Sequence, residues 1–96
     1  MILAEPRVAL QLVGYHDREA VQQFIATHRL PREVYLRSES YRGRPWYALI
    51  YDLYANAEAA DGARSSLPED LTRLDIWLRE LPAGTSLERL STRTTY

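Results

Sequence analysis

The feature that most constrains the fold is an internal repeat, in which the first half of the chain resembles the second half. The first copy reads Tyr-x-Asp-x-Glu-Ala from Tyr15, and the second reads Tyr-x-Asn-x-Glu-Ala from Tyr54, 39 positions later. Around each copy the hydrophobic pattern changes from strand to helix and back to strand. A unit of this kind repeated twice predicts a single sheet with two helices, in the order βαββαβ.

The elements of the first copy follow from periodicity and capping. Residues 7–13 alternate between apolar and other side chains, with Val8, Leu10 and Leu12 on one face, and this predicts the first strand. Asp17 is a typical helix N-cap, and the apolar residues after it recur at helical spacing until Pro31. The first helix is therefore expected between these two residues.

A hairpin is expected to join the two copies. Residues 33–41 and 46–53 are rich in aromatic and aliphatic side chains, and residues 42–44 separate them. Gly43 can adopt the positive φ that a tight turn requires. These two segments are predicted to be the second and third strands.

The second copy ends the predicted domain. Asn56 is expected to cap a second helix that continues to Leu67, and Pro68 opens a short turn that leads to a fourth strand at 75–80. Residues 82–96 are rich in Ser, Thr and Gly, and we expect them to form a loosely attached C-terminal tail. One domain is predicted over residues 7–81.

The repeat also indicates which side chains share a face of the sheet. Superposing the copies places Leu10 on Leu49, so both are expected to face the helices. In the fourth strand Trp77 lies between Asp75 and Arg79 in projection, which favours the opposite face. That open face is expected to carry Gln11, Trp46, Ala48, Ile50, Asp52 and Trp77. The prediction is an α+β fold of the ferredoxin/RNP-like βαββαβ type, a four-stranded antiparallel sheet with two helices on one face, and the bare face is the expected binding surface.

Composition limits the classes of function. The net charge of −1 argues against binding a polyanion by bulk electrostatics, and the chain has no cysteine. His16 and His28 lie too far apart to suggest a metal site, so no metal and no cofactor are expected. No run is long enough to span a membrane, and residues 1–6 do not resemble a signal peptide, so we expect any export signal or anchor to lie outside this segment.

Several short motifs, in order, resemble those of the SPOR domain family. They are Leu-Gln-Leu-Val-Gly-Tyr from Leu10, Arg-Gly-Arg-Pro-Trp-Tyr from Arg42, Tyr-x-x-Tyr-Ala from Tyr51, Ser-Leu-Pro from Ser66, and Trp77. The Gly-x-Pro-Trp-Tyr variant is similar to that of the DamX-type cell-division proteins. The resemblance covers roughly residues 7–81 and implies a non-catalytic, periplasmic module that binds septal peptidoglycan glycan strands lacking stem peptides. It implies a monomer within an anchored or exported protein, with other division proteins as partners of the rest of that protein and no membrane contact of its own.

The resemblance also implies site residues. By position, the glycan-contacting residues of the family fall on Gln11, Gly14, Trp46 and Trp77. Position 14 is glycine where some relatives carry serine, so a side-chain hydrogen bond is not expected there. Strand parity adds secondary contacts at Ile50, Arg37, Arg44 and Arg79, the arginines being suited to the lactyl carboxylates of stem-free glycan.

Other interpretations of these residues remain open from the sequence. Trp46 and Trp77 could be core residues, since large aromatics are mostly buried in proteins. A glycosidase would need two carboxyl groups that flank the bond, and Asp52 with Asp75 is the pair the pattern offers. The main alternative is a single-stranded RNA-binding module, which shares this layout, although residues 45–50 lack its basic-glycine-aromatic signature. The patch could also mediate association between proteins.

Overall fold

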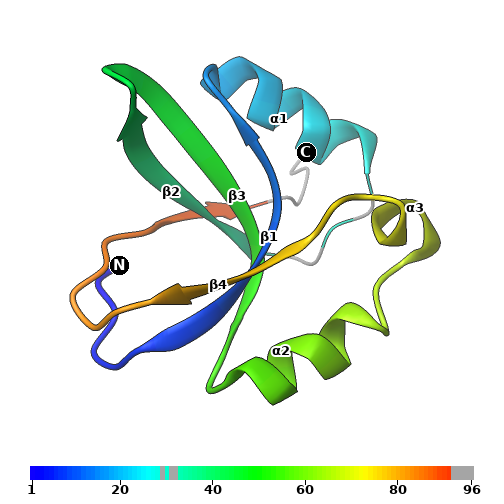
Figure 1. The fold of residues 1–96 in the computed structure, drawn as a ribbon. Coiled ribbons are helices and arrows are strands. Elements are labelled where there is room, and N and C mark those ends of the chain that lie inside the picture. Colours follow the sequence, from blue (N-terminus) through cyan, green and yellow to red (C-terminus); the bar gives the residue numbers. More distant parts are fainter. Residues whose placement is uncertain (29, 31–32, 92–96) are drawn as a thin grey trace.

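The computed structural model describes residues 1–28, 30 and 33–91, which form one antiparallel sheet with helices on one face (Figure 1). The sheet has five strands in the order β4-β1-β3-β2-β5. Their bounds are β1 Arg7–Tyr15, β2 Glu33–Tyr41, β3 Arg44–Tyr54, β4 Trp77–Leu81 and β5 Glu88–Ser91. The predicted α+β class and the order βαββαβ are confirmed for the first four strands.

The helices begin at the predicted caps. Asp17 accepts a hydrogen bond from the backbone of the first turn of α1, Arg18–Thr27, and Asn56 does the same for α2, Ala57–Arg64. Helix α2 is shorter than predicted because the backbone turns at Ser65 and Ser66, both poor helix formers. The turn expected at Pro68 is present as α3, Glu69–Thr72.

A two-residue turn joins β2 to β3. Arg42 and Gly43 both have positive φ, 53° and 77°. This is the turn geometry that matches the twist of adjacent strands, and it confirms the expected role of Gly43. Arg42 adopts the same left-handed region without being glycine, so the hairpin register is held by the strands as well as by the turn.

The main core lies between the sheet and the helices. Leu10, Leu36 and Leu49 are fully buried there against Val21 of α1 and Ala60 of α2. The faces predicted for Leu10 and Leu49 are therefore confirmed. Ala60 has the small side chain that lets α2 approach the sheet closely.

The C-terminal segment corrects two predictions, the number of strands and the loosely attached tail. β5 pairs with β2 at the sheet edge, and Leu87 and Leu90 are both buried, on opposite faces of the sheet. Two leucines in a polar segment are a weak hydrophobic signal, but each packs into a site formed by strands that are distant in sequence. Residues 92–96 of the predicted tail lie outside the described residues.

The N-terminal segment joins this C-terminal segment over the face opposite the helices. The backbone of Leu3 exchanges hydrogen bonds with Thr85 and Gly84, at 2.9 and 2.7 Å, and the Met1 ammonium donates to the Leu87 carbonyl oxygen. Together these segments enclose a second apolar cluster of Leu3, Ala9, Ile50, Leu81 and Leu87. The face expected to be bare is therefore half covered, by the two ends of the chain.

Candidate functional site

A groove occupies the uncovered half of this sheet face. Its volume is about 720 Å³, and strands β1 to β4 all contribute to it. It is lined by Gln11, Leu12, Val13, Gly14, Glu39, Ser40, Tyr41, Trp46, Asp75, Trp77, Leu78 and Arg79.

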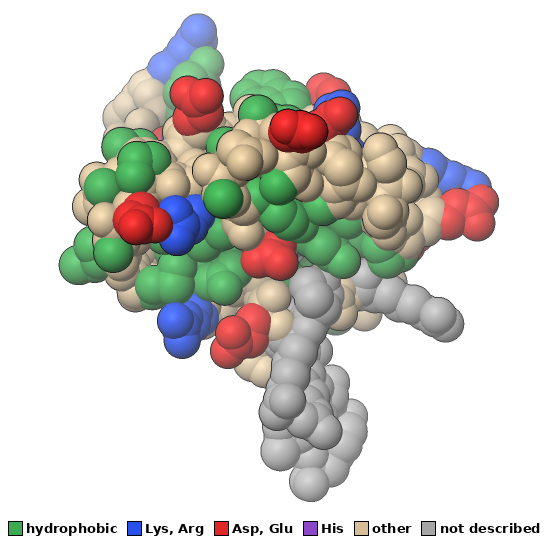
Figure 2. Space-filling model, turned by 90° about the horizontal axis from the view of Figure 1, so that it is seen from below, with side chains coloured by type: hydrophobic (Ala, Val, Ile, Leu, Met, Phe, Trp, Pro, Cys, Tyr) green, Lys and Arg blue, Asp and Glu red, His purple; other side chains and the backbone are tan. Residues whose placement is uncertain are grey.

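On the face of the molecule seen in Figure 2, acidic and basic side chains are interspersed among apolar ones, so no broad region of one charge dominates that view.

Trp46 forms the part of the groove nearest the hairpin. Its indole lies directly over Gly14: a β-carbon built on Gly14 would stand 2.1 Å from the Trp46 Cζ2 atom. The ring makes a T-shaped contact with His16, with ring centroids 4.9 Å apart, and the centroid of the tilted Tyr41 ring lies 6.2 Å away. The His16 Nδ1 is 2.7 Å from the Pro45 carbonyl oxygen, which can only accept, so Nδ1 donates. These contacts hold the half-buried indole in place.

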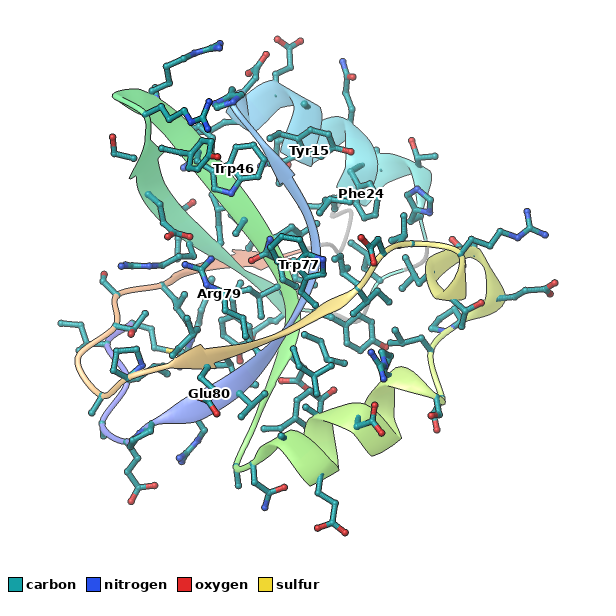
Figure 3. The ribbon with its side chains drawn as sticks, in the orientation of Figure 1. Tyr15, Phe24, Trp46, Trp77, Arg79 and Glu80 are labelled. Atoms are coloured by element: carbon teal, nitrogen blue, oxygen red, sulfur yellow. The ribbon has the colours of Figure 1, made fainter. Side chains whose placement is uncertain are left out.

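Trp77 lies at the start of β4, where it pairs with Gln11 of β1. Its side chain is 60% exposed, which is unusual for a residue with so large an apolar ring. Trp46 pairs with Glu39 across β2 and β3, and Arg79 bonds to both Glu39 and Gln11, so the two indoles labelled in Figure 3 lie on the same face of the sheet. The interpretation of the two tryptophans as helix-side core residues is therefore wrong.

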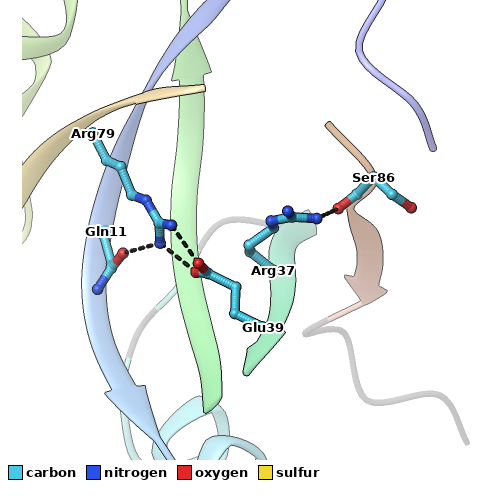
Figure 4. A network of polar contacts seen from close by, with 5 residues as sticks. All are labelled: Gln11, Arg37, Glu39, Arg79 and Ser86. Atoms are coloured by element: carbon cyan, nitrogen blue, oxygen red, sulfur yellow. Dashed lines mark hydrogen bonds and ion pairs between the residues drawn. The ribbon is translucent and has the colours of Figure 1, made fainter. Parts of the chain in front are cut away.

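A polar network forms part of the groove lining (Figure 4). The Arg79 guanidinium makes a two-pronged ion pair with Glu39, at 2.5 and 2.6 Å, and its Nη1 also donates to Gln11 Oε1 at 3.1 Å. Gln11 is only 8% exposed. The hydrogen bond from Arg79 lowers the pKa of Glu39, more than burial raises it, and the same bond raises the pKa of Arg79. Both groups are therefore charged over the physiological range, and each compensates the other.

A β-bulge explains how Gln11 and Gly14 share a face although they are three residues apart. In the pairing of β1 with β3, Gln11 lies opposite Ile50 and Val13 opposite Leu49, so β1 has one extra residue at this point, and a shift in the opposite sense, with the extra residue in β3, lies between Ala9 and Gln11. The extra residue in β1 shifts the alternation by one position and brings Gly14 to the groove side. Strict alternation would have placed Gly14 among the helix-side residues.

The expected secondary contacts fall in different places. Ile50 is fully buried in the second apolar cluster, which corrects its assignment as a ligand contact, because no surface of it is available. Arg37 donates to the Ser86 carbonyl oxygen at 3.0 Å, in the covered half of the face. Arg79 lines the groove but is paired with Glu39, and Arg44 is exposed at the hairpin.

Sequence reasoning missed Glu39. Its parity places it on the groove face, where it pairs with Trp46 across β2 and β3. The alternation of side chains along the strand was therefore the available signal for its face. The ion pair with Arg79 was not predictable in this way, because it joins residues 40 positions apart and depends on the full strand order. Of the two carboxylates considered for hydrolysis, Asp75 lines the groove and Asp52 does not.

Comparison with protein families identifies the family to which this domain belongs. Residues 4–80 match the SPOR domain. The chain belongs to the SPOR domain family. SPOR domains bind peptidoglycan, act as binding rather than catalytic modules, and occur in periplasmic or envelope-side proteins of cell division. No curated protein and no solved structure matched the chain. In the part of this SPOR domain that the structure describes, no helix has both the length and the apolar character required to cross a bilayer.

Proposed function

We propose that this SPOR domain binds peptidoglycan glycan strands that have lost their stem peptides, and thereby brings its parent protein to the division septum. The observation that carries the proposal is the groove on the sheet face. Trp46 of β3 and Trp77 of β4 line it, together with Gln11 and Gly14 of β1, the strand between those two. A strand of sugars is an extended ligand, and an open groove across four strands suits it.

The chemistry of the groove matches that of a glycan. Sugars present apolar C–H faces that can stack on indole rings, and Trp77 offers an exposed ring for this purpose. Acetamido and hydroxyl groups require hydrogen-bond partners, and the amide of Gln11 in the groove lining can provide one. Stacking supplies contact area, while the polar groups determine orientation.

A preference for stripped strands is supported by the hairpin. Removal of the stem peptide frees a lactyl carboxylate on the glycan, and an arginine can bind a carboxylate through two hydrogen bonds. Arg44 is exposed beside the groove-lining Tyr41, to which it is paired in the hairpin. Since Arg37 and Arg79 have other partners, Arg44 is the proposed carboxylate contact.

The finer assignments also belong to this proposal. The Gly-x-Pro-Trp-Tyr motif supports a DamX-like subtype, and the family supports a periplasmic location. We expect the isolated domain to be monomeric, and we expect other division proteins to contact the rest of the parent chain.

The deciding experiment is co-sedimentation with intact sacculi and with sacculi treated with an amidase that removes stem peptides. We expect strong binding to the treated sacculi, weak binding to intact sacculi, and no release of reducing ends during incubation. A single-stranded RNA run in parallel tests the alternative function, which is disfavoured because Glu39 neutralises the groove arginine Arg79 and Asp75 adds a negative charge. Equal binding to both kinds of sacculi would contradict the stated preference, and binding to RNA alone would overturn the proposal.

A further inference from the structure

The orientation of the Gln11 amide is determined by its partner. Arg79 carries only N–H donors, so the Gln11 atom that faces it at 3.1 Å must be the carbonyl oxygen rather than the NH₂ group. This assignment rests on the chemistry of arginine, and it removes the usual ambiguity between the two ends of an amide.

The remaining end of the amide is available to a ligand. Gln11 Nε2 has no hydrogen-bond partner within the described residues, and in that part of the chain no fully buried side-chain nitrogen or oxygen lacks one. Nε2 therefore retains access to solvent, and Figure 4 shows the amide nitrogen on the side away from the guanidinium. Because Gln11 lines the groove, that access is through the groove.

Glu39 holds Arg79 in the position that fixes this amide. Its carboxylate binds both terminal nitrogens of the guanidinium, from a strand two places beyond β1 in the sheet. The same pairing compensates the positive charge of Arg79, so this part of the groove has little net attraction for an anion.

We propose that Glu39 and Arg79 are positioning residues that hold the Gln11 amide with its NH₂ group toward the groove, so that the site selects a neutral hydrogen-bond acceptor, the acetamido carbonyl oxygen of an N-acetylated sugar. This deepens the proposed function and rests on it. The lactyl carboxylate is then recognised elsewhere, at the exposed Arg44 of the hairpin.

The test is a double-mutant cycle on binding to stripped glycan strands, with Glu39→Gln, Gln11→Ala and the double variant. If Glu39 acts through Gln11, Glu39→Gln weakens binding roughly fivefold in the wild-type background and by less than about twofold in the Gln11→Ala background. The matched control is Glu88→Gln, which breaks a second two-pronged pair, Arg18 with Glu88, outside the groove. The control is expected to bind like wild type.

A competition experiment tests the selected group. An oligomer of N-acetylglucosamine is expected to displace the stripped strands from the wild-type domain, whereas a glucose oligomer of the same linkage and length is expected to be much weaker. Gln11→Ala should reduce this difference. An equal loss from Glu39→Gln in both backgrounds, or equal competition by both oligomers, overturns the inference. If the wild-type domain does not bind stripped strands at all, the proposed function itself has failed, and the two failures are thus distinguishable.

Discussion

The Trp46 indole occupies the space that a side chain at position 14 would need. Gly14 is in contact with the ring, and the ring is held further by His16 and Tyr41. Glycine at this position thus leaves room for the indole against β1, because any β-carbon there would overlap the ring.

We predict that Gly14→Ala displaces Trp46. The added methyl group would overlap the indole, so we expect a loss of about 1 to 3 kcal/mol in the free energy of unfolding, a change in tryptophan fluorescence and weaker glycan binding. Urea denaturation and co-sedimentation measure these effects. Gly62→Ala is the control, because Gly62 lies in α2 with open space around it, and it should be neutral or slightly stabilising. A Gly14→Ala variant that behaves like the control would contradict the contact with Trp46.

Trp77→Ala and Trp46→Ala are each expected to weaken binding to stripped sacculi by roughly tenfold or more, as removal of an aromatic anchor does at other binding sites. The stability of Trp77→Ala should remain near wild type, because 60% of that side chain is already in water. Trp46→Ala should lose somewhat more stability, since its ring is half-buried. Co-sedimentation, circular dichroism and thermal melting check this. Undiminished binding by both variants would place the site elsewhere.

At the scale of the elements, β1 organises the molecule. It lies between β3 and β4, places Leu10 in the helix-side core, and places Gln11 and Gly14 on the groove side. The bulge after Gln11 makes this possible without breaking the pairing with β3. One strand thus supplies both the core and the site.

We predict that Leu10→Ala and Phe24→Ala each lower the free energy of unfolding by about 2 to 5 kcal/mol, because each empties volume in the core between the sheet and the helices. Ile2→Ala is the control, since that side chain is 70% exposed and should have little effect. Urea denaturation followed by circular dichroism measures the difference. If Leu10→Ala were as mild as the control, our assignment of the two faces would be wrong.

At the scale of the whole molecule, the two ends of the chain close half of the sheet face. Leu3 and Leu87 cover Ile50, and the backbone bonds between the segments hold this cover in place. The uncovered half is the groove. The cover therefore limits the binding surface to the end of the sheet that carries both tryptophans.

We predict that Leu87→Ala destabilises the domain by about 2 to 5 kcal/mol, although it lies in a segment whose composition suggests a loose tail. Arg89→Ala, an exposed position on the same edge strand, is the matched control and should be near neutral. Thermal melting and urea denaturation distinguish them. If both variants melted with the wild type, the cover would contribute nothing to stability.

The internal repeat assigned the faces of Leu10 and Leu49. Local pattern determined the order of the first four strands and the caps at Asp17 and Asn56, because periodicity and capping depend on residues close in sequence. It also indicated Trp77 as a groove residue, since its neighbours are charged. Only the tertiary structure decided the fifth strand, the burial of Ile50 and the pairing of Glu39 with Arg79. Each of these depends on which distant segments lie side by side, and two leucines or one acidic residue in a polar stretch carry no local signal of the partner they will meet.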